Sequence, residues 1–353
     1  MNLLNRYIFR TIFIATMSVL AVIISLDLLA ILIDEIDRLS ATYTFLEVLI
    51  YVSLSAPDSL YEFMPFAALV GSLVGLGSLA KSSELVVMRA AGISLLKISW
   101  AVMRPVMIFV VLAVLLGEYM IPLANQTAET RRALLLGNKS ALESRADLWN
   151  REGNEFMHFN AVQVNGTIHG VTRYQFDDNG LLTSSSFSET AIYRNGSWQE
   201  QNITETTFTR EGTRVEKIPV RSWNTTLYPQ LLNLLVLAPD DLSIDDLYTY
   251  SRYLDQEKID SSKYWLSFWK KLLQPLATIS LVLIAISFIF GPLRQATMGY
   301  RIFAGVIVGI TFQMVQNLLA PASLVYGFSP LIAVGLPICC CFIWGLLSLK
   351  KVG

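Results

Sequence analysis

Few residues in this sequence have the type and spacing needed for chemistry. Two histidines, His158 and His169, flank an Asn-Gly pair at 165–166, and a hairpin turn there would bring their imidazoles close together. A metal site would need further cysteine or carboxylate ligands, and the sequence places none next to either histidine. Such a pair is more typical of a sheet surface, so we predict no metal site.

Catalytic motifs do not occur in the sequence. It contains no Gly-Lys dipeptide, and therefore no phosphate-binding loop of the ATPase type, and no HExxH, CxxC or GxSxG motif. The three cysteines are adjacent, Cys339 to Cys341, in an apolar run where consecutive side chains point in different directions around a helix. We expect them to pack in lipid or protein. We also expect no enzyme activity and no cofactor in this chain, so any ATP hydrolysis must come from another subunit.

Long apolar runs dominate the elements that position these residues. The chain has 353 residues, 53% of them hydrophobic, and a mean hydropathy of +0.49, which is too apolar for an ordinary soluble domain. Most of its charged residues fall between Ala124 and Lys263, so a water-soluble insert lies between two apolar blocks. The first apolar run has no small-residue cleavage site, and we expect it to remain as a span.

Six stretches have about the 20 helical residues that a hydrocarbon core requires. They are Ile8 to Ile33, Pro57 to Ala80, Ile98 to Ile121, Trp265 to Phe290, Ile302 to Ala320 and Pro330 to Leu349. Among the residues that flank the spans outside the large insert, the basic ones lie mainly on one side: Arg6, Arg10, Lys81, Arg89, Lys97, Arg294, Arg301, Lys350 and Lys351. Basic loops stay in the cytoplasm, which predicts cytoplasmic termini and an insert on the outside.

Small and acidic residues within the spans allow two interpretations each. Pairs of glycines four residues apart, Gly71 with Gly75 and Gly305 with Gly309, permit close helix contact, as ordinary packing or as a special contact motif. Asp27, Glu62 and Glu118 lie near the outer ends of spans. They would line a wet vestibule open to the outside, or they would reach to the interface.

The insert has the sequence pattern of β-structure. Asn-Gly pairs at 165–166, 179–180 and 195–196 are suited to type I′ hairpin turns. Between the first two, apolar and polar residues alternate with the period of a half-buried strand. We predict an antiparallel β-sandwich or jelly roll over about 145–227, followed by a helical return segment that starts at Ser243 with a capping box to Asp246.

A short helix is predicted in the turn between the second and third spans. Ser83 is suited to cap its start, Glu84 places a carboxylate at the positive end of the helix dipole, and Gly92 supplies a left-handed stop. Val87, Met88 and Ala91 would form an apolar face. Either an interfacial turn or a knob that binds another protein accounts for this face.

Three motifs resemble one family of membrane proteins along the whole chain. "SELVVMRAAG" (83–92), "ISFIFGPLR" (286–294) and "LVYGFSP" (324–330) are similar to the LptF/LptG permeases of the lipopolysaccharide exporter of Gram-negative bacteria, and to the LptG members more than the LptF members. The resemblance implies an ABC transporter permease in the inner membrane. It also implies a heterodimer with LptF, two copies of the cytosolic ATPase LptB, which would bind ATP and Mg²⁺, an LptC subunit, and a bridge through periplasmic LptA.

The resemblance assigns the short helix as the coupling helix that docks on the ATPase. Glu84 and Arg89 would make polar contacts, Val87, Met88 and Ala91 would pack, and Gly92 would end the helix. The family also implies that the first and fifth spans line lateral gates, which would make Gly305 and Gly309 gate packing positions.

Lipid A phosphates need cations at the outer rim of the permease. The candidates for substrate binding are Arg38, Arg131, Arg132, Lys270 and Lys271. Neighbouring helical residues point about 100° apart, so one of the two lysines should face inward. Relatives often carry lysines near the end of the first span, but this chain reads "ILIDEIDRL" over 31–39, so that phosphate clamp does not transfer.

The expected domains are three. Residues 1–123 carry three spans and the short cytoplasmic helix at about 83–92, residues 124–264 form the periplasmic jelly-roll-like domain with its helical return, and residues 265–353 carry three more spans. A rival hypothesis is a membrane chaperone or insertase with a periplasmic β domain and no ATPase partner. An efflux-type ABC permease and a membrane hydrolase fit less well, because the insert position and the motifs do not match.

Overall fold

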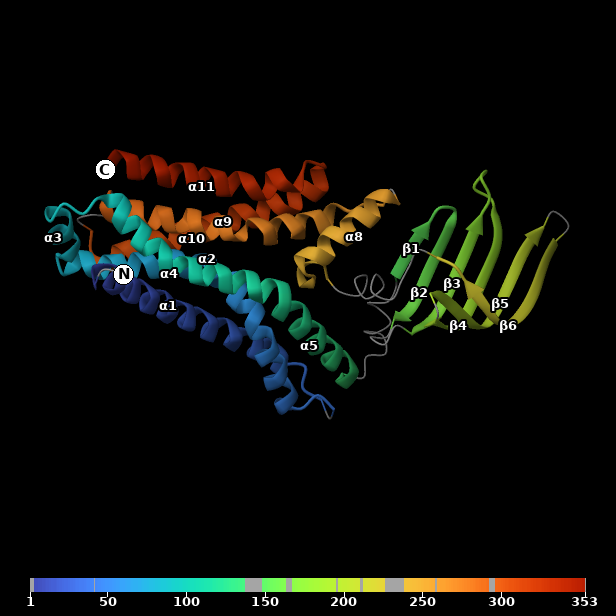
Figure 1. Ribbon diagram of the computed structural model, residues 1–353. Helices are drawn as coiled ribbons and strands as arrows, with labels where there is room; N and C mark the ends of the chain where they lie inside the picture. The colour runs from blue at the N-terminus through green and yellow to red at the C-terminus, as the bar shows by residue number, and fades with distance from the viewer. Residues whose placement is uncertain are drawn as a thin grey trace. The chain divides into compact units, whose positions relative to one another are not determined.

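The computed structural model describes residues 3–40, 42–136, 148–162, 167–194, 196–209, 212–225, 238–257, 259–291 and 296–352 (Figure 1). These residues form two compact units, which we describe separately. The first is a helical unit of Met1–Leu39, Thr44–Ala128 and Trp265–Gly353, and the second is a sheet unit of Ser40–Tyr43 and Glu129–Tyr264.

Six helical segments are long and apolar enough to cross a membrane. They are α1 (Leu3–Ile36), α2 (Phe45–Lys81), α4 (Leu95–Leu115) with its continuation, α9 (Ser262–Phe290), α10 (Met298–Tyr326) and α11 (Pro330–Val352). The third segment runs from α4 through a π-helical turn, η1 (Leu116–Met120), into α5 (Ile121–Leu135). The six predicted spans are therefore confirmed as helices, but most helices extend beyond them because backbone hydrogen bonding continues into the polar flanks.

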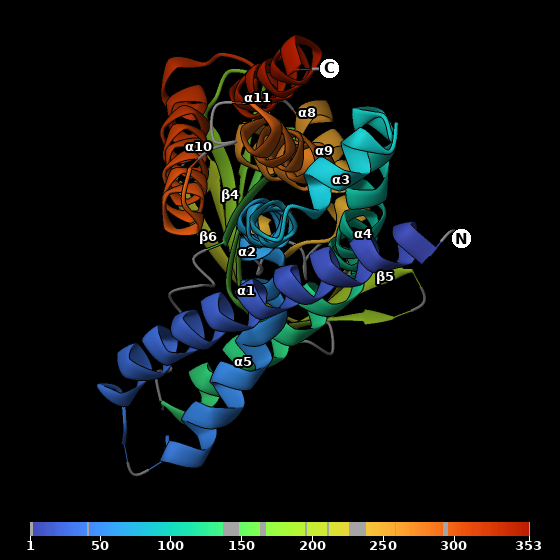
Figure 2. The ribbon, with the colours of Figure 1, turned by 90° about the vertical axis from the view of Figure 1, so that its left-hand side faces the viewer.

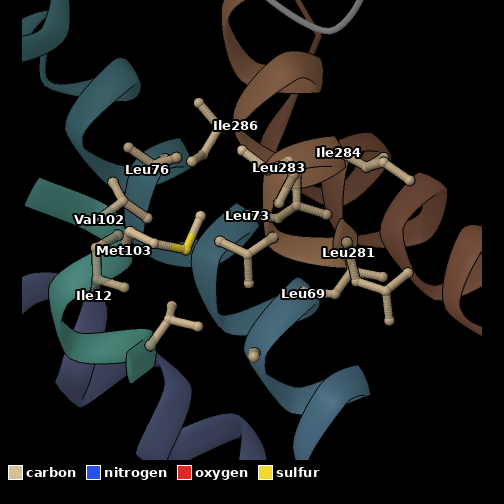
Figure 3. Packing of buried hydrophobic residues seen from close by; sticks show 14 of the residues in the cluster. Ile12, Leu69, Leu73, Leu76, Val102, Met103, Leu281, Leu283, Ile284 and Ile286 are labelled. Carbon is tan, nitrogen blue, oxygen red and sulfur yellow. The ribbon is translucent and has the colours of Figure 1, made fainter. Parts of the chain in front are cut away.

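Helix α2 occupies the middle of the helical unit, with α1, α4, α9 and α10 around it (Figure 2). Leu69, Leu73 and Leu76 of α2 pack with side chains of α1, α4 and α9 (Figure 3). This position explains why α2 is the most buried of the six segments. The helix is apolar on all sides because nearly every side meets protein.

The glycine pairs make the close helix contacts that their spacing predicted. A Cβ at Gly71 would lie 2.4 Å from Thr16 Cα of α1, and one at Gly75 would lie 2.7 Å from Ile12. On α10, a Cβ at Gly305 would lie 2.2 Å from Leu73, and one at Gly309 would lie 2.3 Å from the Phe66 ring. Helix α2 thus contacts α1 through its own glycines and α10 through the glycines of α10.

The described strands of the second unit form one antiparallel sheet in simple sequential order, β1 to β6. The strands are β1 (Leu148–Glu152), β2 (Glu155–Val162), β3 (Ile168–Phe176), β4 (Leu182–Arg194), β5 (Ser197–Thr209) and β6 (Gly212–Trp223). The prediction of an all-β insert is confirmed. The described strands contribute a single sheet, and they include no second sheet of a sandwich.

Helix α8 (Ile244–Gln256) packs on one face of this sheet, where Tyr250 and Leu254 join a core with Trp198 and Trp223. Burial raises the pKa of the Tyr250 hydroxyl above its ordinary value. Ser243 caps the start of α8 as predicted, because the Asp246 N–H donates to Ser243 Oγ at 3.1 Å, and Ser243 Oγ donates to Asp246 Oδ2 at 2.6 Å. A 3-10 turn, η2 (Pro239–Asp241), precedes it.

A buried ion-pair network crosses the same sheet. Glu200 is fully buried and accepts from Arg173 Nη1 at 2.8 Å and from Arg221 Nη2 at 3.0 Å, and Arg221 also donates to Glu205 at 3.1 Å. Buried carboxylates need such donors. The nearby Glu200 and Glu205 carboxylates raise the pKa of the Arg221 guanidinium, although burial alone would lower it.

The hairpin at 179–180 differs from the predicted type I′ turn. Gly180 has a left-handed φ of +79°, but Asn179 is not left-handed, whereas a type I′ turn needs both. The Asp177 carboxylate accepts from the N–H groups of Leu181 (2.8 Å) and Asn179 (2.9 Å), which lowers its pKa below 3.8. Asp177 therefore stabilises a longer turn. Residues 165 and 166, and Asn195, lie outside the described residues.

The two histidines do not face each other. In the register of β2 and β3, His158 lies opposite Thr172, and His169 lies opposite Ala161. The His158 ring packs on Trp149, 4.9 Å between centroids. Within the described residues no group of three or more His, Cys, Asp or Glu side chains could hold a metal ion.

Candidate functional site

The short helix between α2 and α4 is present as α3 (Glu84–Ala90). Gly92 ends it with a φ of +83°, as predicted. The Gly92 N–H donates to the Arg89 carbonyl at 3.0 Å, and the Ile93 N–H donates to the Met88 carbonyl at 3.1 Å. These are the two hydrogen bonds of a Schellman motif, so the end of α3 is fixed by the backbone.

The start of α3 differs from the prediction. Ser83 has a left-handed φ of +62°, and its side chain makes no capping hydrogen bond. The preceding Ser82 is the residue that meets the helix, because its Oγ lies 2.7 Å from Glu84 Oε1. The prediction that the Ser83 side chain caps α3 was therefore wrong. Residue 83 instead forms the tight turn from α2 into α3.

The faces of α3 are defined by which side chains the helical unit buries. Leu85 and Met88 are buried in the same core as Ile8 of α1 and Ile98 of α4. Met88 is therefore not on the outer face where it was predicted, because the spacing of three residues from Leu85 places both on the inner face.

The outer face of α3 contains most of the predicted docking residues. Val87 is 65% exposed, and Arg89 and Ala91 are exposed beside it. The sequence reasoning missed Val86, which is 55% exposed and stands next to Val87. The run of apolar residues 85–88 gave no indication of which pair would be outside. An exposed valine pair beside Glu84 and Arg89 is suited to binding a protein surface.

Glu84 also contacts the first helix. Tyr7 of α1 donates its hydroxyl hydrogen to Glu84 Oε1 at 3.2 Å, across 77 positions of sequence. Glu84 Oε1 therefore meets two hydroxyl groups, those of Tyr7 and Ser82. No sequence pattern indicates this pairing, because the two residues become neighbours only when α1 packs against α2.

Arg38 and Arg132, two of the three predicted substrate-binding arginines, have acidic partners. Arg38 Nη1 lies 3.1 Å from Glu35 Oε1, and Arg132 Nη1 lies 3.4 Å from Glu129 Oε1. Arg131 is exposed. Arg38 belongs to the helical unit, whereas Arg131 and Arg132 belong to the sheet unit. The structure thus does not gather these residues with the two lysines into one described site.

Lys270 and Lys271 of α9 differ, as their 100° separation predicted. Lys271 is buried, and its Nζ lies 3.5 Å from the Gly117 carbonyl of η1. In a π turn a carbonyl accepts from the residue five positions later, which for Gly117 is Pro122, a residue without an N–H. The Lys271 ammonium therefore meets a carbonyl that the helix cannot use. Lys270 is only partly buried.

A second carbonyl freed by proline lies on α2. Pro65 has no N–H to donate to the Tyr61 carbonyl four residues earlier. Gln274 of α9, one helical turn after Lys271, donates from Nε2 to that carbonyl at 2.7 Å. Lys271 and Gln274 of α9 thus each donate to a backbone carbonyl of a neighbouring helix inside the bundle.

Arg301 makes a comparable contact at the start of α10. Its side chain is buried, and Nη1 donates to the Gly77 carbonyl of α2 at 3.2 Å. The sequence alone indicates only that Arg301 is a basic residue beside a span. This hydrogen bond and the close contacts that Gly305 and Gly309 of α10 make with α2 hold α10 against the central helix.

The family assignment follows from the whole chain. The family model described as lipopolysaccharide export system permease LptF/LptG matches residues 6–351. The chain belongs to this LptF/LptG family. It is a multi-pass protein of the inner membrane and a permease component of a lipopolysaccharide export complex. The family resemblance of the three sequence motifs is thereby confirmed.

Curated relatives place the chain near the LptG members of the LptF/LptG family. The lipopolysaccharide export system permease protein LptG of Escherichia coli K12 is 34% identical over 354 residues, covering 99% of this chain and 98% of the relative. The LptG protein of Haemophilus influenzae is 32% identical over 355 residues, covering 99% of both chains. The similarity therefore spans both apolar blocks and the insert.

Proposed function

We propose that this chain is an LptG-type permease subunit that takes lipopolysaccharide from the inner membrane and drives it toward the outer membrane with energy from a separate cytosolic ATPase. The observation that supports this most directly is α3, a rigid exposed helix on a chain that lacks a phosphate-binding loop of its own. ATP and Mg²⁺ would be bound by the ATPase, LptB in the family.

The geometry of α3 is suited to transmitting force. Its end is fixed by a Schellman motif, and Leu85 and Met88 are buried in the helical core. Val86, Val87 and Arg89 remain exposed for the ATPase. A push on the exposed face would therefore move the core-facing side with it instead of bending the helix.

Cargo binding requires apolar surface for acyl chains and cations for phosphates. The exposed faces of α1 and α10 are apolar, with Val22, Leu26, Phe303 and Met314 among their exposed residues. Of Lys270 and Lys271 on α9, Lys270 is the better phosphate ligand, because Lys271 is buried against Gly117. Arg38, Arg131 and Arg132 remain candidates for the outer rim.

The proposed assembly places this chain beside LptF, with two LptB subunits below and LptC alongside. Both termini and α3 lie in the cytoplasm, and the sheet unit lies in the periplasm, where it would join the LptA bridge. The basic loop residues support this orientation, since Lys81, Arg89 and Lys97 flank or belong to α3. The gate role of Gly305 and Gly309 is part of the same proposal.

Co-purification tests the docking of the ATPase. We expect Glu84→Lys to abolish the stable complex between the permease and the ATPase, because a cation would replace the carboxylate of the docking face. Glu216→Lys on the exposed face of β6 is the matched control and should leave the complex intact. A Glu84→Lys permease that retains the ATPase at the wild-type level would contradict docking at α3.

A further inference from the structure

The Glu84 carboxylate is held by only one of its two oxygens. Oε1 contacts the hydroxyl groups of Tyr7 at 3.2 Å and Ser82 at 2.7 Å. In the described part of the chain, Oε2 makes no hydrogen bond. A carboxylate with one oxygen fixed and the other available is oriented for a charge-assisted hydrogen bond from outside.

Tyr7 also connects α1 to α3 through its hydrogen bond to Glu84. It lies in the second turn of α1, directly before Ile8, which is buried in the same core as Leu85 and Met88 of α3. The polar contact of Tyr7 with Glu84 thus lies next to the apolar contact of Ile8. Since apolar contacts are not directional, the hydrogen bonds from Tyr7 and Ser82 are what orient the Glu84 carboxylate.

We propose that Tyr7 is a positioning residue for ATPase docking: with Ser82 it holds Glu84 Oε1, so that Oε2 accepts a hydrogen bond from a basic side chain of the ATPase. This inference rests on the proposed function, because it assumes that α3 is the docking helix. It adds a residue of α1 to the docking apparatus and makes the first helix part of the path by which the ATPase acts.

The test uses the complete permease complex in nanodiscs, titrated with the purified ATPase subunit. We expect Tyr7→Phe to raise the apparent Kd for the ATPase about threefold to tenfold, the net effect of losing one ordinary hydrogen bond. Tyr300→Phe is the control, because Tyr300 is exposed at the start of α10 and its hydroxyl makes no hydrogen bond within the described residues. It should leave the Kd unchanged.

A double-mutant cycle separates positioning from a general structural role. In a Glu84→Ala background, Tyr7→Phe should have no further effect on the Kd. An equal loss in both backgrounds would overturn the proposal, and so would a wild-type Kd for Tyr7→Phe. If Glu84→Ala alone binds the ATPase normally, docking at α3 itself fails.

Ser82→Ala supplies a second measurement in case Glu84→Ala abolishes detectable binding. The proposal then stands only if Ser82→Ala and Tyr7→Phe both weaken docking while Tyr300→Phe does not. Tyr7 is 47% exposed, so Tyr7→Phe should unfold at the wild-type temperature. If Tyr7→Phe unfolded at a lower temperature and Tyr300→Phe raised the Kd by the same factor, the weaker binding would come from a folding defect and the proposal would be wrong.

Discussion

At the scale of single residues, the interior of the helix bundle contains a charged side chain, Lys271, that stabilises the fold. Ionisable groups in a membrane are costly and need partners. Lys271 meets the Gly117 carbonyl, which η1 and Pro122 leave without a backbone donor. The same side chain therefore cannot also serve as a freely accessible phosphate ligand.

Replacing the two lysines tests this assignment. We expect Lys271→Met to destabilise the protein by about 1–3 kcal/mol, because it leaves the buried Gly117 carbonyl unpaired. Lys270→Met should change stability by less than about 0.5 kcal/mol, as is usual for partly exposed positions. Thermal unfolding in detergent measures both. A larger loss of stability for Lys270→Met than for Lys271→Met would show that Lys270, and not Lys271, is the buried lysine.

A photocrosslinker at position 270 should label lipopolysaccharide, whereas one at position 271 should label protein. The difference follows from burial of Lys271 in the bundle. Mass spectrometry of the crosslinked products distinguishes the two cases. Lipid labelling from position 271 alone would contradict the proposed cargo contact.

Asp177 gives a pH-dependent contribution to stability. Hydrogen bonds from Leu181 and Asn179 lower the pKa of its carboxyl in the folded protein. The contribution is therefore present above the unfolded value of about 3.8 and is lost as the pH falls through the lower folded pKa. We expect Asp177→Asn to lower the unfolding temperature at pH 7, and to lower it by less as the pH falls further below about 3.8. Glu216→Gln, exposed on β6, should have no effect at any pH in this range.

At the scale of elements, α3 shows what local sequence determines. The stop at Gly92 was predictable, because a left-handed residue after a short helix is a local requirement. The inner position of Met88 and the unused cap at Ser83 were not, because both depend on how tightly α2 turns into α3. The partner of Glu84 lies on another helix and leaves no local pattern.

Helix α10 offers a graded test of close packing on α2. Gly309→Ala should destabilise the protein by about 1–3 kcal/mol, because its Cβ would lie 2.3 Å from the Phe66 ring. Gly305→Ala should cost less, since the atom it meets is the flexible end of Leu73. Gly299→Ala has open space and should be neutral or stabilising by up to about 1 kcal/mol. Unfolding temperatures in any other order would contradict the described packing.

At the scale of the whole molecule, apolar runs and strand alternation were sufficient to predict six spanning helices and an all-β insert. Length and periodicity are global signals that tertiary contacts seldom override. The π turn at Leu116–Met120 and the buried Arg301 could not be predicted, because they result from packing between distant helices. The position of α3 in the chain was therefore predicted correctly, but which of its side chains face the core was not.

Membrane orientation can be tested with two exposed valines. In a chain whose three cysteines are replaced by alanine, Val215→Cys on β6 and Val87→Cys on α3 are comparably exposed, at 62% and 65% for the native side chains. In spheroplasts an impermeant maleimide should label position 215, and position 87 only after lysis. Labelling of position 87 in sealed spheroplasts would place α3 on the wrong side for a cytosolic ATPase.

The sequential strand order of the sheet has a consequence for biosynthesis. Every backbone ladder joins strands that follow one another in the chain, so loop closure is short at each step. Helix α8, which covers the sheet, also precedes α9. The sheet unit can therefore fold as it is synthesised, whereas the Tyr61 carbonyl of α2 has to wait for α9 before Gln274 donates a hydrogen bond to it.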